Sequence, residues 1–195
     1  MSREASVRRT TGETDVNVSV ELDVPGRSEI STGVGFFDHM LTLFARHGLV
    51  GLSVQASGDL ETGSHHTIED VGITLGQALD RALGDRSGIE RYGSALVPMD
   101  EVLVQAVVDI SGRPLVVMDV ALPDGAIGGF EYECLIEFLR GVANHARLTL
   151  HVRLLAGGGA HHIIEGVFKA VARALAAAVA FSPKVTGVPS TKGSL

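Results

Sequence analysis

The chain has 195 residues, and its 16 Lys and Arg against 23 Asp and Glu give a formal net charge of −7 at pH 7. A chain of this length can bury a sizeable hydrophobic core without a disulfide or metal to hold it. The acidic balance argues against a nucleic-acid-binding protein. The one cysteine, Cys134, can form neither an internal disulfide nor a cysteine-type zinc site, so histidines and carboxylates are the only candidate metal ligands.

Targeting and membrane segments are not expected. No run of about 18 apolar residues occurs, and the opening MSREASVRRTTGET has arginines with no apolar stretch behind them. A single cysteine fits a reducing compartment. We therefore expect a cytoplasmic protein with no membrane partner.

The first half of the chain reads as strands and helices in alternation. Apolar residues alternate over Val16–Leu22, as in a half-buried strand. They recur at helical spacing over Phe36–His47, with Gly48 placed to end that helix. A short strand over 52–56 and a helix over about 68–83 follow. The order for this half is strand, strand, helix, strand, helix.

The second half repeats this order around the turn Ser111-Gly112-Arg113-Pro114. Its predicted elements are strands at 102–110 and 115–120, a helix at 130–145, a strand at 148–154 and an Ala-rich helix at about 163–180. We expect the Ala-rich helix to pack against its counterpart at 68–83, because small side chains allow two helices to approach closely.

A repeated motif shows that the two halves are an internal duplication. HHTIE at 65–69 and HHIIE at 161–165 lie 96 residues apart, and Ala-Leu pairs at 78–79 and 174–175 keep that offset. We divide the chain into one domain of two repeats, about 1–95 and about 96–182, followed by a tail at 183–195.

Each HHxxE motif is suited to metal binding. On a helix, adjacent histidines point 100° apart and the glutamate falls between them. One rigid helix does not easily aim both rings at a single ion, so the two histidines of each pair are predicted to bind different ions. Two ions shared between the pairs are the economical solution. The candidate ligands are His65, His66, Glu69, His161, His162 and Glu165.

Two further histidines are candidates to complete the coordination. His151 lies on an alternating strand and points away from its apolar face. His39 lies in the first turn of its helix beside Asp38, which could orient its ring. Taken alone, either would more often be a hydrogen-bonded histidine at the edge of the core. Nitrogen and carboxylate ligands without thiolate favour Mn²⁺, with Fe²⁺, Co²⁺ or Zn²⁺ as substitutes.

A second set of residues is suited to bind an anion such as phosphate. Guanidinium groups bind phosphate oxygens in pairs, and the tail Pro189–Gly193 offers a hydroxyl and an ammonium group to close a cradle. A basic terminus can also simply be frayed. The candidates are Arg91, Arg113, Lys169, Ser190 and Lys192, with His47 as a further substrate-binding candidate.

Several motifs together resemble a known family. In order they are RTTGET, TGVGFFDHM, HHTIED, GDRSGIERYG, PMDE, DISGRP, LTLHV, HHIIEGVFKA and PSTKG. The chain resembles the imidazoleglycerol-phosphate dehydratases of histidine biosynthesis, nearly end to end. The resemblance implies an α+β fold of duplicated ββαβα halves with helices on one face of the sheets. It also implies a large homo-oligomeric shell built from trimers, with active sites between subunits and two Mn²⁺ ions in each.

The resemblance also implies roles for particular residues. The metal ligands would be His39, His65, His66, Glu69, His151, His161, His162 and Glu165. The phosphate would meet Arg91, Arg113, Lys169, Ser190 and Lys192. Glu13 would be an acid/base carboxylate, with Glu69 and Glu165 as the other catalytic candidates. The family usually has acidic residues where this chain has Gly63-Ser64, and an Asn where it has Gly159.

The implied reaction converts imidazoleglycerol phosphate to imidazoleacetol phosphate plus water through a metal-stabilised imidazolate intermediate. Two alternatives stay open at this point. One is a dinuclear metallohydrolase that acts on a phosphate ester. The other is an inactive, metal-binding structural shell, which would not need the anion-binding residues.

Overall fold

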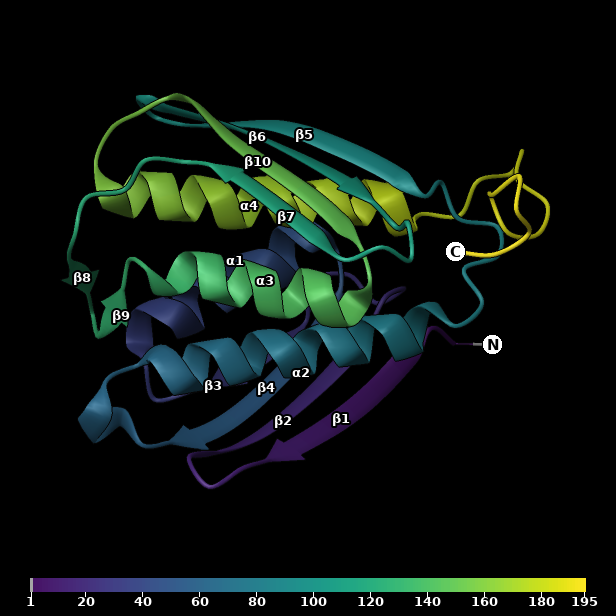
Figure 1. Cartoon of the computed structure of the whole chain (residues 1–195). Helices are drawn as coiled ribbons and strands as arrows, with labels where there is room; N and C mark the ends of the chain where they lie inside the picture. The colour runs from purple at the N-terminus through teal and green to yellow at the C-terminus, as the bar shows by residue number, and fades with distance from the viewer. Residues whose placement is uncertain (1) are drawn as a thin grey trace.

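The computed structural model describes residues 2–195 and consists of two four-stranded sheets with four helices between them (Figure 1). The first half holds β1 (Glu4–Thr10), β2 (Thr14–Glu21), β3 (Ser28–Ser31), α1 (Gly35–Gly48), β4 (Gly51–Gly58), a 3₁₀ turn (Leu60–Thr62) and α2 (His65–Leu83). The second holds β5 (Tyr92–Met99), β6 (Val102–Asp109), β7 (Leu115–Asp119), β8 (Ala126–Ile127), β9 (Phe130–Glu131), α3 (Cys134–Ala146), β10 (Thr149–Ala156) and α4 (Ala160–Val179).

The two sheets have the same topology. Their strand orders are β1-β2-β4-β3 and β5-β6-β10-β7. In each, the first three strands are antiparallel and the last pair is parallel. The α+β fold of duplicated halves, with helices on one face of each sheet, is thereby confirmed.

Before its first helix, the first half carries one strand more than the sequence predicts and the second half three more, two of which, β8 and β9, form a separate small sheet. The unpredicted strands include β1 and β5, which form one edge of each sheet. In β1, Val7 is the one residue that is fully buried, so the strand lacks the apolar alternation that identifies β2. Edge strands bury less side-chain surface and therefore give a weaker sequence signal.

The start of α3 also differs from the prediction. Phe130 was expected to begin this helix, but Phe130–Glu131 pairs with Ala126–Ile127 as a small hairpin, and the helix begins at Cys134. Gly128 and Gly129 both adopt positive φ, at 54° and 81°, which makes the tight turn possible. Phe130 is buried against Phe36 and Phe37.

The expected packing of α4 on α2 is wrong. Instead α2 packs on α3, and α4 packs on α1. The α2–α3 crossing is so close that a β-carbon on Gly72 would lie 2.6 Å from the carbonyl oxygen of Phe138. Small residues do permit the close approach, as expected, but here they are glycines on α2 and α3, which let the two backbones lie against each other.

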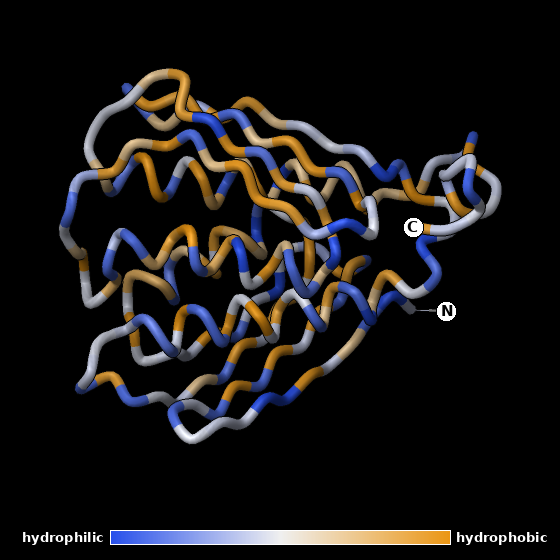
Figure 2. Tube along the Cα trace, viewed as in Figure 1, coloured by the Kyte–Doolittle hydropathy of each residue, from blue (hydrophilic) through white to orange (hydrophobic). Residues whose placement is uncertain are grey.

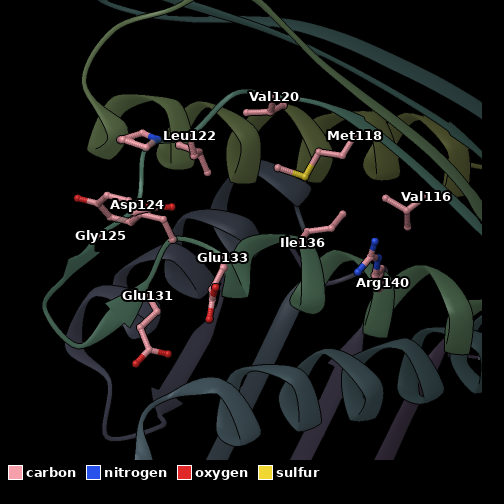
Figure 3. Close-up of a pocket in the computed structure, with 12 residues that line it drawn as sticks. Val116, Met118, Val120, Leu122, Asp124, Gly125, Glu131, Glu133, Ile136 and Arg140 are labelled. Atoms are coloured by element: carbon pink, nitrogen blue, oxygen red, sulfur yellow. The ribbon is translucent and has the colours of Figure 1, made fainter.

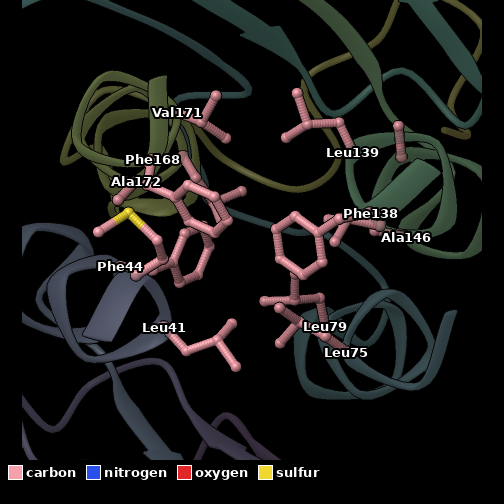
Figure 4. Packing of buried hydrophobic residues seen from close by; sticks show 14 of the residues in the cluster. Leu41, Phe44, Leu75, Leu79, Phe138, Leu139, Ala146, Phe168, Val171 and Ala172 are labelled. Atoms are coloured by element: carbon pink, nitrogen blue, oxygen red, sulfur yellow. The ribbon is translucent and has the colours of Figure 1, made fainter. Parts of the chain in front are cut away.

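The core lies between the two sheets and among the four helices. The rings of Phe138 and Phe168 stack 5.1 Å apart (Figure 4). Phe37 meets Phe138 edge-on at 5.4 Å. Hydrophobic and hydrophilic residues alternate along the strands, which keeps the outer sheet faces more polar (Figure 2). Within residues 2–195, none of the helices has the length and apolar character needed to cross a membrane.

Candidate active site

The two HHxxE motifs form matching arrangements at the N-terminal ends of α2 and α4. Nε2 of His65 lies 3.7 Å from Oε2 of Glu69, and Nε2 of His161 lies 3.2 Å from Oε2 of Glu165. The two rings of each pair are almost perpendicular, with interplanar angles of 87° and 82°. Each helix end therefore presents its two imidazoles in different directions.

The second histidine of each pair contacts a carboxylate from outside its own helix. Nδ1 of His66 lies 3.0 and 3.1 Å from the two carboxylate oxygens of Asp59, which follows β4. Nδ1 of His162 lies at the same two distances from those of Glu101, in the turn between β5 and β6. Sequence reasoning missed both carboxylates, although PMDE, which contains Glu101, was among the family motifs.

These contacts change the pKa of the groups involved. The hydrogen bond with Asp59 raises the pKa of His66, and the one with Glu101 raises that of His162. The backbone N–H of Glu101 itself, with the ring of His162 and the N–H of Gly159, lowers the pKa of the Glu101 carboxyl to about 2. Both acids are therefore ionised and strong acceptors at neutral pH.

Glu13 lies beside the first histidine pair. Its Oε2 is 3.8 Å from Nδ1 of His66, and 57% of its side chain is exposed. The turn that carries it is well fixed, because Oγ1 of Thr11 accepts hydrogen bonds from the N–H groups of Glu13 and Thr14. The carbonyl of Glu13 also accepts from the N–H of Asp59 at 3.2 Å. The expected acid/base carboxylate is thus held at a candidate metal-binding histidine.

Glu165 and Lys169 form an ion pair one turn apart on α4, with Nζ 2.6 Å from Oε1. Burial raises the pKa of Glu165, but the hydrogen bond from Lys169 and the contact with His161 outweigh it, so the net pKa is lowered. Burial, together with the charges of Lys169 and Arg173, lowers the pKa of the nearby His47. Lys169 is therefore held by Glu165 in this ion pair, and the charge of Lys169 acts on His47.

Arg91, Arg113 and the tail meet at the other end of α4. Nε of Arg91 lies 2.8 Å from Asp109, and its Nη1 donates to the carbonyl of Pro189 at 2.9 Å. Arg113 lies 3.6 Å from the same aspartate and keeps 65% of its side chain exposed. Within the tail, the N–H of Lys192 donates to Oγ of Ser190 at 3.2 Å. Asp109 thus links Arg91 to Arg113, and Arg91 in turn holds the tail through the carbonyl of Pro189.

His39 and His151 are not brought to the motifs of their own chain. His151 is exposed on the outer face of β10, between the buried Leu150 and Val152, in the direction that the alternation predicts. His39 is exposed in the first turn of α1. The expected partner of His39, Asp38, instead accepts from the N–H and hydroxyl of Thr32 at 2.9 and 2.6 Å.

One chain does not assemble the whole candidate ligand set. Within residues 2–195, three potential ligand atoms come within 4.8 Å of one another only in the group Asp100, Glu101 and His162. The donor chemistry nonetheless fits a divalent metal. His66 and His162 are each held through Nδ1, which leaves Nε2 as the ligand atom, an arrangement typical of metal-binding histidines.

The anion cluster and the histidine pair lie at opposite ends of α4. The N–H of Arg91 donates to the carbonyl of Ala178 at 2.9 Å. Ala178 follows His162 by 16 residues on this helix, and at 1.5 Å per residue the two ends are about 24 Å apart. Figure 1 shows the tail at one end of the molecule and the start of α4 at the other.

A cavity of about 640 Å³ is separate from all of these residues. It lies between β7 and α3 (Figure 3) and includes Met118, Leu122, Tyr132 and Arg140 in its lining. None of the candidate catalytic, metal-binding or phosphate-binding residues lines it.

The comparisons with known proteins agree on one family. A sequence model described as "Imidazoleglycerol-phosphate dehydratase" matches residues 32–175. Relatives named imidazoleglycerol-phosphate dehydratase are 56% identical in Albidiferax ferrireducens, covering 100% of this chain and 96% of the relative, and 55% identical in Moorella thermoacetica, covering all of both.

Solved structures give the same result. The imidazoleglycerol-phosphate dehydratase of Staphylococcus aureus is 42% identical with a TM-score of 0.83, covering 92% of this chain and 99% of that one. A Pyrococcus furiosus structure, titled as IGPD in complex with (S)-C348, is 41% identical with a TM-score of 0.83 and covers 97% of this chain and 100% of that one.

Proposed function

Because the chain belongs to the imidazoleglycerol-phosphate dehydratase family, a family of hydro-lyases, we propose that it removes water from imidazoleglycerol phosphate with a pair of divalent metal ions. The observation that carries this proposal is the pair of matching HHxxE helix ends, each with its second histidine anchored by a carboxylate. The reaction belongs to histidine biosynthesis, and we place it in the cytoplasm.

The metal site is proposed from the ligand chemistry. Imidazole nitrogens and carboxylate oxygens without thiolate suit Mn²⁺, and we propose two ions per active site. Bound there, the ions would supply Lewis-acid stabilisation of negative charge on the imidazole ring of the substrate. The residues that would hold them are His39, His65, His66, Glu69, His151, His161, His162 and Glu165.

The anion cluster is proposed to bind the phosphate. Arg113 offers an exposed guanidinium, and Arg91 fixes the tail that carries Ser190 and Lys192. Two guanidinium groups, a hydroxyl and an ammonium group match the several oxygens of a phosphate. Holding the phosphate at a fixed distance from the imidazole ring aligns the carbon chain between them, which can lower the barrier by several kcal/mol, on the order of the ~7 kcal/mol that good positioning supplies.

Proton transfer falls best to Glu13. The reaction breaks a C–H bond on one carbon and a C–O bond on its neighbour, giving water and an enol that becomes the ketone. Glu165 is 7% exposed and already bonded to Lys169 and His161, so its carboxylate is occupied. Glu13 is exposed, with His66 as its nearest ionisable partner at 3.8 Å. A free, well-positioned carboxylate is the better proton carrier, and Glu69 is the second candidate.

We further propose that the active site forms between subunits of a large homo-oligomer built from trimers. The two functional clusters of one chain are about 24 Å apart along α4, whereas a three-carbon chain joins the imidazole and phosphate of the substrate. One substrate molecule cannot span the two clusters of one chain. A phosphate cluster from one subunit beside a metal cluster from another removes this difficulty.

The direct test is to incubate the purified, Mn²⁺-loaded protein with imidazoleglycerol phosphate and follow the loss of one water by mass spectrometry. A chelated sample and a generic aryl phosphate are the controls. Metal-dependent ketone formation without hydrolysis of the aryl phosphate supports the dehydratase. Hydrolysis of the aryl phosphate would point to a metallohydrolase. If the metal-loaded protein catalysed neither reaction, that result would point to a structural shell.

A further inference from the structure

We propose that Asp59 and Glu101 are positioning residues, which fix the ring orientation and tautomer of His66 and His162 respectively, and that Asp59 thereby frees Glu13 for proton transfer. This inference rests on the proposed metal site. It assigns to two carboxylates a role that neither the motifs nor the ligand set had given them.

The starting observation is that Glu13 and Glu101 occupy the same position in the two halves. Glu13 immediately precedes β2 (Thr14–Glu21), and Glu101 immediately precedes β6 (Val102–Asp109). Both strands have eight residues, and each lies second in its sheet, beside an edge strand that leads into the same turn. His66 and His162 are likewise counterparts, in the repeated HHxxE motifs. The duplication therefore places one turn carboxylate beside one histidine in each half.

The two counterparts are used differently. Glu101 contacts Nδ1 of His162 directly, at 3.0 and 3.1 Å. Glu13 lies 3.8 Å from Nδ1 of His66 because Asp59 already holds that nitrogen at 3.0 and 3.1 Å. In the first half, therefore, Asp59 and not the turn residue Glu13 anchors the histidine.

The second half has no counterpart of Asp59. Asp59 precedes His66 by seven residues, and the residue seven before His162 is Leu155, whose side chain cannot accept a hydrogen bond. Glu101 must therefore anchor His162, and only in the first half is the turn carboxylate released. The asymmetry explains why one of two equivalent glutamates is available as an acid or base.

Both anchors are themselves held in place. The carboxylate of Glu101 accepts from the N–H of Gly159 at 3.1 Å, and a β-carbon on Gly158 would lie 2.0 Å from its Oε1, so the glycines before α4 make room for it. Oδ2 of Asp59 accepts from the hydroxyl of Thr62 at 3.1 Å. A fixed carboxylate that accepts from Nδ1–H keeps the proton on that nitrogen and leaves the lone pair on Nε2.

The test compares Asp59→Asn, Glu101→Gln and Glu13→Gln with the wild-type protein. Mn²⁺ affinity is measured from the EPR signal of free Mn²⁺, and the visible spectrum of the Co²⁺-loaded protein reports the ligand geometry. We expect Asp59→Asn and Glu101→Gln to weaken Mn²⁺ binding about 10–100-fold and to shift the Co²⁺ bands, as is typical when a group that orients a ligand is lost. Asp59→Glu and Glu101→Asp should recover part of the affinity.

Glu13→Gln should give the opposite result, with Mn²⁺ affinity and Co²⁺ spectrum as in the wild type but a strongly reduced kcat. Glu61→Gln is the matched control, because Glu61 is exposed close to Asp59 and makes no ion pair among residues 2–195. Its affinity should equal that of the wild type.

Wild-type Mn²⁺ affinity in Asp59→Asn and Glu101→Gln would overturn the positioning role while leaving the proposed metal site intact. Equal loss of Mn²⁺ affinity in Glu13→Gln and Glu101→Gln would overturn the proposal that Glu101 anchors a histidine while Glu13 does not. Failure of the wild-type protein to bind Mn²⁺ at all would instead refute the proposed metal function, and the inference with it.

Discussion

Gly93 on β5 lies against the backbone of Ala174 on α4, so closely that a β-carbon at residue 93 would be 1.9 Å from the carbonyl oxygen of Ala174. The strand and the helix can approach this closely because residue 93 has no side chain and the helix residues that face it are alanines. The alanines of α4 that were expected to face α2 serve this contact with the sheet.

We therefore expect Gly93→Ala to lower the free energy of unfolding by about 3 kcal/mol, the upper part of the range for overpacked cores, because backbone atoms must move. Urea unfolding followed by circular dichroism measures the change. Gly35→Ala is the control, since no atom lies within 4 Å of the β-carbon it would add. Equal stability of the two variants would show that the strand and helix separate without cost.

The separation of the two clusters predicts complementation between inactive variants. His162→Ala removes a proposed metal ligand, and Arg91→Ala removes a proposed phosphate-binding group and the hydrogen bond that holds the tail. If each active site takes these residues from different subunits, dissociating the two variants and reassembling them together should restore activity, while each reassembled alone stays inactive. Activity that never returns in the mixture would place both residues in the same chain's site.

Removing a proposed ligand should remove metal and activity together. We expect His66→Ala or His162→Ala to lose Mn²⁺ affinity by more than the about 10–100-fold typical of groups that only orient ligands. Metal content after dialysis and turnover measure the two effects. A variant with full metal content and normal turnover would be inconsistent with the shared ligand set.

Lys192→Ala tests the role of the tail in phosphate binding. Loss of one charged hydrogen bond to a phosphate costs about 1.5 kcal/mol or more, so KM should rise about 10-fold while kcat changes little. Steady-state kinetics with the Mn²⁺-loaded protein separate the two parameters. An unchanged KM would mean that the basic tail is only a frayed terminus.

The hairpin that carries Glu13 gives a pH-dependent prediction. Hydrogen bonds from Arg8 and Thr10 lower the pKa of Asp15 to about 2 from its ordinary 3.8. A depressed carboxyl pKa contributes stability above the unfolded-state pKa, and that contribution is lost as the pH falls through the folded-state pKa. Asp15→Asn should therefore be less stable than the wild type at neutral pH.

The difference in stability between Asp15→Asn and the wild type should shrink as the pH falls from about 4 to about 2. Urea unfolding of the metal-free proteins across this range measures it, with Glu61→Gln as the control. A difference that stays constant down to pH ~2 would mean that Asp15 acts through shape and not through its charge.

The sequence predicted the repeated units and most elements, because their signals are local. Alternation identified β2, and helical spacing identified α1 to within one residue at each end. The polar edge strand β1 gave no such signal, and the partners of α2 and α4 depend on glycine contacts between distant segments. The histidine motifs could be recognised because they occur twice in the sequence. Asp59 could not be recognised in this way, because it has no counterpart in the second half.

The helix packing has a consequence for the history and folding of the chain. In each half the first helix lies on the second helix of the other half, α1 on α4 and α3 on α2. A half-length ancestor would have left these faces uncovered, and two copies would have had to exchange helices to bury them. A tandem duplication of such a chain would join the two copies, each covering the other's helices, in one polypeptide. The two halves must still fold as one cooperative unit, since neither holds its own helical partner.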